Sequence, residues 1–461
     1  MRGMKSADEF DLIVLGAGLA GVCSALQAAS AGAHVLLIEK QERIGGSSVM
    51  SGGCLAFAGT DIQRSHGVED SSDLLFEDLR EVGKLENVEA VVRAYTDHQL
   101  ETYEWLKANG VEFSDALETA SGQSAPRVHN VDPADMVRRL ASLCENSGKV
   151  TLLRSARAER LLRSSGDARV NGVLISHDGT SREFRATRGV VLTTGGFCRN
   201  RELVHRFAPQ YDEAFFIGGD GNVGDGLRMA WALGADFRDM AYIKGTFGKH
   251  PVDETNHHSC LAVYKGAIAV NQDGKRFVDE SLSYKLLGDA VMAQPYHTGY
   301  QILDQDIFEG GDNRVRILDF ERRLEEGLMI QADSLEKLAQ LIEVPSAVLL
   351  ATIERYNQSV AAGKDEEFGR EHLVHKYGTL RRIERPPFYA YPSTAVVFGT
   401  YCGLTVDAHM RVLDVFGEPI PGLFAAGEVV GGLHGAAYMT GSALGKAAIF
   451  GRIAARTAIT A

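Results

Sequence analysis

The chain has 461 residues, of which 45% are hydrophobic and 24% charged, and its formal net charge is −13. This length allows two or three domains with substantial cores, and the composition is ordinary for a soluble globular protein. The negative charge argues against nucleic acid or an anionic membrane as a partner, because either would need a basic face, so we expect an enzyme that acts on a small molecule.

The first predicted element is a buried parallel strand, Leu12–Leu15, which three spaced glycines follow at once. Gly16 permits a tight turn, Gly18 lets the backbone approach a pyrophosphate, and Gly21 lets the next helix pack closely on the strand. Glu39 closes the second strand, where its carboxylate can accept hydrogen bonds from a ribose. The stretch therefore predicts a Rossmann-like dinucleotide site, with the phosphates at the helix N-terminus.

A glycine- and serine-rich loop follows Glu39 and can lie flat against a large planar ligand. Together with the preceding strand and glycines, this loop resembles the FAD-binding domain of the fumarate reductase and succinate dehydrogenase flavoprotein superfamily, which also contains the 3-ketosteroid dehydrogenases. Some members attach FAD to a histidine of this loop, and no histidine lies between His34 and His66 here, so the resemblance implies non-covalent FAD. It also implies FAD contacts from Lys40, Gly46, Ser47, Ser48, Gly52 and Gly53.

Two segments with helical periodicity come next, Ser71–Gly83 and Asn87–Asn109, the second with Asn87 as its expected N-cap. A predicted loop then carries Arg127 and His129, and similar Arg-x-His stretches occur near flavin and substrate in fumarate-reductase relatives. These two side chains could hold a substrate carboxylate, and they could equally be surface charges or structural partners.

A buried strand further along ends in Thr194 and Gly195 and resembles the second FAD-contacting strand of the superfamily. Asp225 lies in a Gly-Asp-Gly that opens a helix and resembles a recurrent element of these flavoproteins, although an acid there also suits the helix dipole. Before that strand, β segments are predicted at 151–162, 170–175 and 183–187, with a hairpin turn at Asp178-Gly179.

The flavin motifs stop near residue 237 and return in the last part of the chain. The resemblance therefore implies an α/β fold in which a Rossmann-like FAD-binding domain, residues 1–236 and 371–461, carries an inserted α+β capping domain, residues 237–370. A cap makes physical sense because hydride chemistry needs water excluded and the substrate oriented.

Within the predicted cap, the segment that ends at Tyr284 follows the superfamily pattern Asn-x-x-Gly-x-Arg-Phe-x-Asn/Asp-Glu. Fumarate reductases place an arginine shortly after this pattern, whereas 3-ketosteroid dehydrogenases have a tyrosine where Tyr284 stands. The resemblance implies a catalytic Tyr284, provided that a cationic or tyrosyl neighbour lowers its pKa from about 10. The plainer alternative is that Tyr284 packs at a helix start.

In the last block, Phe398, Gly399 and Thr400 stand where fumarate reductases have a histidine that binds a substrate carboxylate, and Tyr438 stands where they have a second substrate arginine. The steroid enzymes polarise the substrate ketone with a tyrosine and a glycine amide, for which Tyr438 and Gly441 are the nearest matches, at a spacing that differs by one residue. The resemblance also implies cofactor contacts from Gly427, Glu428, Ser442, Ala443 and Leu444.

A dicarboxylate site needs arginines that clamp both carboxylates, and Tyr284, Gly399 and Tyr438 occupy those positions here. We therefore predict an FAD-dependent desaturase of a cyclic ketone, steroid-like or of the cyclohexanone type such as 4-oxocyclohexanecarboxylate, with any ring carboxylate held by Arg127 or another cationic group. Tyr438 and the Gly441 amide would stabilise the enolate, and Tyr284 would remove the proton next to the carbonyl as the neighbouring carbon gives its hydride to flavin N5.

Two alternatives remain open: an ene-reductase that runs the reverse reaction on an enone or unsaturated acid, and a flavin redox or electron-transfer protein without turnover. The six cysteines form no CxxC pair, so we expect no metal site, cluster or covalent haem, and electrons would leave to oxygen or an external acceptor. Neither a signal-peptide core nor a membrane-spanning apolar run is present, so we expect a cytoplasmic protein.

Overall fold

The computed structural model describes residues 9–166, 168–252 and 259–460. A six-stranded sheet with the order β20-β21-β11-β2-β3-β7 lies in one half of the molecule, and its strands run parallel apart from β20 at one edge. The strand predicted ahead of the glycines is present as β2 in the middle of this sheet, so the predicted Rossmann-like α/β fold is confirmed. The strands are β2 (Leu12–Leu15), β3 (Val35–Ile38), β7 (Val150–Leu153), β11 (Val190–Leu192), β20 (Arg411–Leu413) and β21 (Pro419–Ala425).

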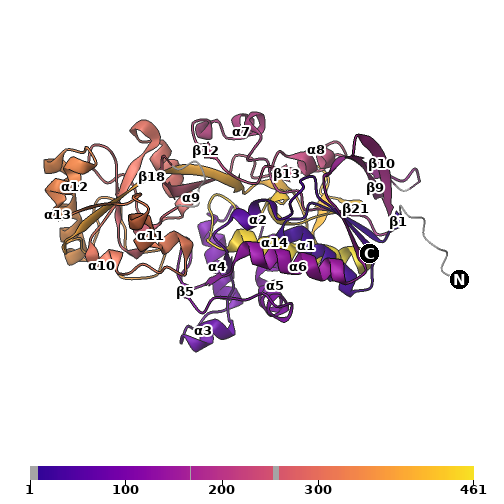
Figure 1. The fold of residues 1–461 in the computed structure, drawn as a ribbon, viewed down its shortest axis with the longest axis horizontal. Coiled ribbons are helices and arrows are strands. Elements are labelled where there is room, and N and C mark those ends of the chain that lie inside the picture. The colour runs from indigo at the N-terminus through magenta and orange to yellow at the C-terminus, as the bar shows by residue number, and fades with distance from the viewer. Residues whose placement is uncertain (1–8, 167, 253–258, 461) are drawn as a thin grey trace.

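Three helices lie side by side next to this sheet: α1 (Leu19–Ser30), α6 (Pro133–Asn146) and α14 (Ser442–Thr460) (Figure 1). Helix α14 approaches α1 closely because Gly451 has no side chain; a Cβ there would lie 2.4 Å from the Ala20 carbonyl oxygen. The last helix of the chain is thereby held against the helix of the glycine fingerprint.

A smaller sheet with the order β1-β10-β9-β8 contains the β segments predicted at 170–175 and 183–187. The segment predicted at 151–162 is two strands: β7 belongs to the six-stranded sheet and β8 to this one. Asp178 and Gly179 have φ of 49° and 73°, the left-handed conformations that a tight hairpin turn requires, so the predicted turn is confirmed. The strands are β1 (Glu9–Phe10), β8 (Ala156–Arg163), β9 (Val170–His177) and β10 (Thr180–Ala186).

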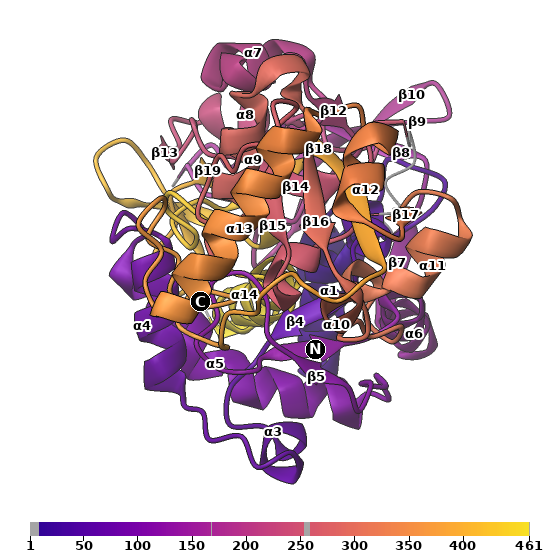
Figure 2. The ribbon, with the colours of Figure 1, turned by 90° about the vertical axis from the view of Figure 1, so that its left-hand side faces the viewer.

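A third sheet, with the order β12-β18-β16-β15, forms the other half of the molecule, and β14 and β17 also pair with β18. Figure 1 shows it at one end together with α10 to α13, and in Figure 2 helices α12 and α13 lie in front of it. Strand β18 comes after residue 370, so this sheet extends past the predicted end of the cap. The strands are β12 (Phe215–Phe216), β14 (Ile243–Lys249), β15 (Ile268–Val270), β16 (Gly299–Leu303), β17 (Ile330–Ala332) and β18 (Phe388–Thr400).

Two helices predicted from periodicity are present as α4 (Ser72–Val82) and α5 (Glu89–Ala108). The expected N-cap of the second is wrong, because Val88 occupies that place. The Asn87 side chain instead donates to two backbone carbonyls and accepts a hydrogen bond from Arg80.

The segment with Arg127 and His129, predicted as a loop, contains strand β6 (Val128–Asn130), which pairs with β4 (Cys54–Ala56) and with β5 (Leu117–Glu118). All three residues of β6 are buried, so the strand has no alternation of apolar and polar residues that would reveal it.

No helix among the described residues is long and apolar enough to cross a membrane. The remaining elements are α2 (Gly46–Met50), α3 (Asp61–Ser65), α7 (Arg201–Phe207), α8 (Asp225–Trp231), α9 (Tyr284–Met292), α10 (Gln305–Phe308), α11 (Phe320–Glu325), α12 (Leu335–Leu341), α13 (Ser346–Ala362), β13 (Phe237–Arg238) and β19 (Gly403–Leu404).

Candidate functional site

A cavity of about 770 Å³ runs from the glycine fingerprint to the elements of the third sheet. Its volume lies in the range of small-molecule and cofactor sites, about 300–1,000 Å³. Most of the predicted site residues line it: Gly16, Gly18, Glu39, Lys40, Gly46, Ser47, Ser48, Gly52, Thr194, Gly195, Asp225, Tyr284, Phe398, Gly399, Thr400, Gly427, Glu428, Tyr438, Gly441, Ala443 and Leu444.

At one end of the cavity, Gly18 is the N-cap of α1, and it has no side chain that could accept hydrogen bonds from the first N–H groups of the helix. The first turn of α1, which the structure describes in full, carries no acidic residue. Backbone N–H groups at such a helix start, with the positive end of the helix dipole, favour an anion. Gly21 does not line the cavity, but a Cβ on it would lie 1.8 Å from the Gly16 carbonyl oxygen, which fits its predicted role of close helix packing.

Glu39 follows strand β3 and lies against the glycine turn. Its two carboxylate oxygens accept hydrogen bonds from the backbone N–H groups of Ala17 and Gln41, both at 2.9 Å. These bonds fix the carboxylate beside the cavity, where it has further lone pairs for the hydroxyls of a ribose.

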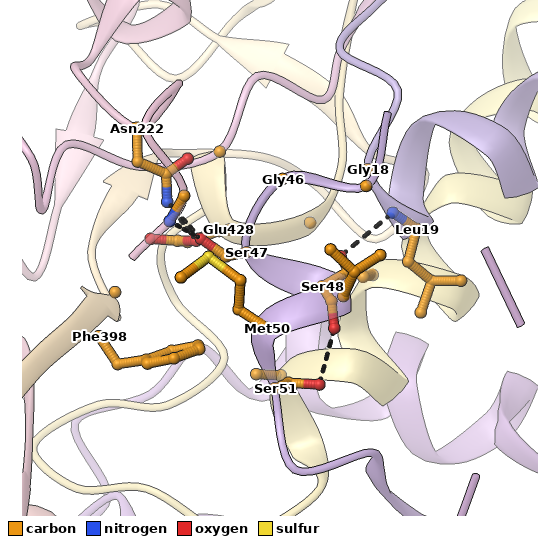
Figure 3. A pocket seen from close by; sticks show the side chains of 18 of the residues that line it. Gly18, Leu19, Gly46, Ser47, Ser48, Met50, Ser51, Asn222, Phe398 and Glu428 are labelled. Carbon is orange, nitrogen blue, oxygen red and sulfur yellow. Dashed lines mark hydrogen bonds between the residues drawn. The ribbon is translucent and has the colours of Figure 1, made fainter. Parts of the chain in front are cut away.

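The serines of α2 hold the loops around the cavity, as Figure 3 shows. Ser48 Oγ accepts a hydrogen bond from Leu19 N–H at 3.2 Å, and Ser47 Oγ accepts from the Asn222 side chain at 3.0 Å. The same Asn222 amide donates to Glu428 at 3.0 Å, and Thr400 N–H donates to the other Glu428 oxygen at 2.9 Å. Segments far apart in sequence are therefore fixed around one space.

Asp225 begins α8, and its carboxylate forms ion pairs with Lys40 at 2.7 Å and Arg157 at 3.2 Å. Both Asp225 and Lys40 line the cavity. The ion pairs tie the start of α8 to Lys40 and Arg157 at the edge of the cavity.

Besides Gly21, two further predicted cofactor residues, Gly53 and Ser442, do not line the cavity. A Cβ on Gly53 would lie 2.0 Å from the Val131 carbonyl oxygen, and Ser442 Oγ donates to the Met439 carbonyl at 2.6 Å. Each stabilises a turn next to the site.

At the other end of the cavity, three tyrosine rings gather. The ring centroids of Tyr284 and Tyr438 are 5.3 Å apart, and Tyr401 stacks on Tyr438 at 5.1 Å with an interplanar angle of 5°. Sequence reasoning did not single out Tyr401, although it lies beside Phe398–Thr400, a stretch chosen for its likeness to a substrate-binding loop. The Tyr401 hydroxyl has no hydrogen-bond partner among the described residues.

Two serines that sequence reasoning missed tie Tyr284 to Tyr438. Ser283 is the N-cap of α9, and its hydroxyl donates to the Tyr438 carbonyl at 2.8 Å. Ser121 Oγ donates to the same carbonyl at 3.0 Å and accepts from Tyr284 N–H at 3.3 Å. Both serines lie far from Tyr438 in sequence, and no local pattern marks them.

Two of the three tyrosines have a raised pKa. Burial, and then the nearby hydroxyls of Tyr438 and Tyr401, raise the pKa of Tyr284 well above its ordinary value. Burial raises the pKa of Tyr401 in the same way. The catalytic role predicted for Tyr284 required a cationic or tyrosyl neighbour that lowers its pKa, and its tyrosyl neighbours instead raise it.

The Tyr438 hydroxyl accepts a hydrogen bond from Ala443 N–H, in the first turn of α14, at 3.3 Å. This contact aims the Tyr438 hydroxyl at the helix start that lines the cavity, beside Gly441. A helix N-terminus and a phenol O–H at one place suit a developing negative charge on oxygen.

Arg127 and His129 do not line the cavity. Arg127 is fully buried and forms ion pairs with Asp70, at 2.7 Å, and with Asp78. His129 Nδ1 lies 2.9 Å from the Arg127 carbonyl and Nε2 lies 2.8 Å from Thr60 Oγ1. Of the readings left open for this pair, the geometry supports structural partners, and a substrate carboxylate held by Arg127 is excluded by its burial.

The sequence matches the family described as FAD binding domain over residues 11–444. The fumarate reductase (cytochrome) of Shewanella frigidimarina is 31% identical over 458 residues, which cover 98% of this chain and 77% of that protein. The 4-oxocyclohexanecarboxylate 2-dehydrogenase of Sinomonas cyclohexanicum is 28% identical over 513 residues, which cover 91% of this chain and 87% of that protein.

Among solved structures, the 3-ketosteroid-Δ4-(5α)-dehydrogenase from Rhodococcus jostii RHA1 in complex with 4-androstene-3,17-dione is similar. The TM-score is 0.78 and the sequence identity 26%, with 99% of this chain and 98% of that chain covered. The family match includes both the glycine fingerprint at one end of the cavity and the three tyrosines at the other.

Proposed function

The chain belongs to the FAD binding domain family and is an FAD-dependent oxidoreductase acting on CH–CH groups, and we propose that its substrate is a cyclic ketone that it desaturates next to the carbonyl. The ketone is of the steroid or cyclohexanone type, 4-oxocyclohexanecarboxylate being one example. The observation that carries the proposal is the tyrosine cluster at the end of the cavity opposite the glycine fingerprint.

The residues present fit non-covalent FAD. The start of α1 offers backbone N–H groups to a pyrophosphate, Glu39 offers a carboxylate to a ribose, and Ser47 and Glu428 are fixed along the cavity between them and the tyrosines. When bound, FAD supplies a two-electron acceptor for hydride.

Tyr438 and the start of α14 act on the carbonyl oxygen. The Tyr438 hydroxyl and the Gly441 amide donate hydrogen bonds to that oxygen and stabilise the negative charge of the enolate. Tyrosines stand at 284 and 438, where fumarate reductases have arginines that clamp two carboxylates, so this end of the cavity is suited to a neutral C=O group.

Tyr284 acts on the proton of the carbon next to the carbonyl. Tyr284 takes this proton as the tyrosinate and becomes the neutral phenol, the form that its raised pKa favours, while Tyr438 keeps its own proton for the carbonyl oxygen. The Tyr284 oxygen binds the proton of one carbon, the electron pair of that broken C–H bond forms the C=C bond, and the hydride leaves from the neighbouring carbon. The Tyr284 phenol then releases its proton to water, and an external acceptor or oxygen takes the two electrons.

Anaerobic mixing tests the proposal. Oxidised enzyme mixed with saturated cyclic ketones loses its oxidised-flavin absorbance, and the product is the α,β-unsaturated ketone, lighter by two hydrogens. Failure of every steroid and cyclohexanone-type ketone to bleach the flavin would contradict it.

A second candidate is an ene-reductase that acts on an enone or unsaturated acid. The observation that favours it is the raised pKa of Tyr284, because a phenol that keeps its proton suits a general acid better than a base. Reoxidation of the reduced enzyme by an enone, with no bleaching by the saturated ketone, would select this candidate. A flavin protein without turnover predicts no pocket over the cofactor and is disfavoured by the cavity that Tyr284 and Thr246 line.

A further inference from the structure

Arg316 lines the cavity and begins a short helical turn, Arg316–Leu318, between α10 and α11. Its only described hydrogen bond from the side chain goes to the Met50 carbonyl at the end of α2, at 3.5 Å. Among the described residues it has no carboxylate partner. Its neighbours in sequence differ: Arg314 pairs with Asp312, and both Arg322 and Arg323 pair with Glu326.

The surroundings of this guanidinium are positive. Burial and the neighbouring Arg323 lower the pKa of Arg316. Cys54 and, less strongly, Asp132 act in the opposite direction, and the Asp132 carboxylate is occupied as the N-cap of α6, where it accepts hydrogen bonds from two backbone N–H groups at 2.8 and 2.9 Å. A half-buried cation without a counter-charge is costly, and an anionic ligand would relieve that cost.

The pyrophosphate of FAD does not supply this anion. It belongs at Gly18 and the start of α1, and Gly18 is bridged to Gly45, just before α2 begins. Arg316 contacts Met50, the last residue of α2, which Figure 3 labels, so a whole short helix separates the two places. Arg316 is also next to Ile317, whose carbonyl accepts from Leu261 N–H, and all three residues line the cavity that the tyrosines also line.

We propose that the substrate is a cyclic oxo-acid whose ring carboxylate binds to Arg316 while its ketone faces Tyr438. This proposal rests on the proposed function and narrows its substrate class. A planar guanidinium donates two parallel hydrogen bonds to a carboxylate, so it fixes the ring in one orientation as well as adding affinity. A ketone and a carboxylate on opposite sides of one ring would satisfy both ends of the pocket.

Binding to the oxidised holoenzyme tests the carboxylate site independently of turnover. Calorimetric titration with cyclohexanecarboxylate, which has no ketone to oxidise, is compared with cyclohexanecarboxamide, which has the same shape without the charge. Arg316→Met weakens carboxylate binding by about 10- to 100-fold and leaves the carboxamide unchanged, as expected for the loss of a charge-assisted hydrogen bond. Arg316→Lys keeps part of the affinity.

Arg314→Met is the matched control, because Arg314 is exposed and ion-paired two residues away, and it leaves both affinities unchanged. The proposal is overturned if wild type does not bind the carboxylate, if Arg316→Met binds it normally, or if both ligands weaken together. It is also overturned if Arg316→Met is purified without FAD, since the arginine would then serve the cofactor.

The proposed function has a separate readout. Bleaching of the flavin by uncharged cyclohexanone in Arg316→Met reports on ketone desaturation alone. If carboxylate binding depends on Arg316 but no ketone bleaches the flavin, the desaturase is rejected and the carboxylate site is kept. If a ketone bleaches the flavin but carboxylate binding does not depend on Arg316, the carboxylate site is rejected and the desaturase is kept.

Discussion

At the scale of single residues, the site depends on two tyrosines whose backbones are tied by the hydroxyls of Ser121 and Ser283. Because these hydrogen bonds fix the start of α9 against the turn before α14, the two phenol rings meet without any charged group between them. The end of the cavity beside these two tyrosines is therefore polar without carrying a charge.

Tyr438→Phe keeps the ring stacking and removes the hydroxyl that we assign to the carbonyl oxygen. We expect the rate of flavin reduction by ketone to fall by about 100- to 1,000-fold, the usual effect of losing one oxyanion donor. Stopped-flow absorbance measures it, and flavin content confirms that FAD still binds. Tyr356→Phe is the control, since Tyr356 is buried outside the cavity and its hydroxyl has no described partner; an equal loss in the control would refute the assignment.

His129 gives a prediction about pH. Burial lowers its pKa from 6.5 to about 4, so the unfolded chain binds a proton that the folded chain does not between these values. The contribution of neutral His129 to the free energy of unfolding is fully present above pH 6.5 and is lost as the pH falls toward 4. We expect about 2 kcal/mol of it to be lost between pH 6.5 and 5. Urea unfolding of wild type and His129→Gln should differ in this slope, and parallel slopes would disprove the assignment.

Arg127 illustrates why residue roles were harder to predict than elements. An arginine two residues before a histidine in a predicted loop is equally compatible with a substrate site and a buried ion pair. The partners that decide the matter, Asp70 and Asp78, are 57 and 49 residues away in sequence. Tyr401, Ser121 and Ser283 were missed for the same reason, because their importance comes from contacts across the fold.

At the scale of elements, the glycine fingerprint was predictable because its conformational demands are local. Gly21→Ala would place a Cβ 1.8 Å from the Gly16 carbonyl oxygen, so α1 must move away from the turn. We expect the variant to be purified with little FAD, as judged by the ratio of flavin to protein absorbance. Gly166→Ala, where no atom lies within 4 Å of the added Cβ, should retain FAD; full flavin content in Gly21→Ala would contradict this packing role.

The Asn-x-x-Gly-x-Arg-Phe-x-Asp-Glu segment is also built around a buried network. Arg276 bonds to Glu280 at 2.7 Å and to Asp365 at 2.9 Å, and Arg370 adds a bond to Glu280 at 3.3 Å. The network fixes the turn that leads to α9, so the segment that marked Tyr284 in the sequence also holds it in place.

Arg276→Met leaves two buried carboxylates short of a partner. We expect a loss of about 3–5 kcal/mol in the free energy of unfolding, the usual effect of removing one member of a buried ion pair. Chemical unfolding monitored by circular dichroism measures it. Arg322→Met, which breaks an exposed pair with Glu326, should cost less than about 1 kcal/mol, and similar losses in both variants would be inconsistent with a buried network.

At the scale of the whole molecule, strand β18 joins the two halves. It pairs with β14, β16 and β17 in the third sheet, and its last residues, Phe398–Thr400, line the cavity that begins at the glycine fingerprint. The sequence predicted an inserted capping domain but could not predict this strand as part of its sheet, since pairing partners up to 181 residues earlier, as for Phe215 and Val396, are invisible to local patterns. The domain boundaries themselves stay a prediction.

The central claim is that the end of the cavity beside Tyr284 and Tyr438 binds a neutral carbonyl group. A crystal structure of the oxidised holoenzyme with a saturated cyclic ketone tests it most directly. We predict the ketone oxygen within about 2.6–3.2 Å of the Tyr438 hydroxyl, with the Tyr284 hydroxyl facing the adjacent ring carbon. A ketone bound elsewhere, or both phenol groups turned away from the flavin, would contradict the account.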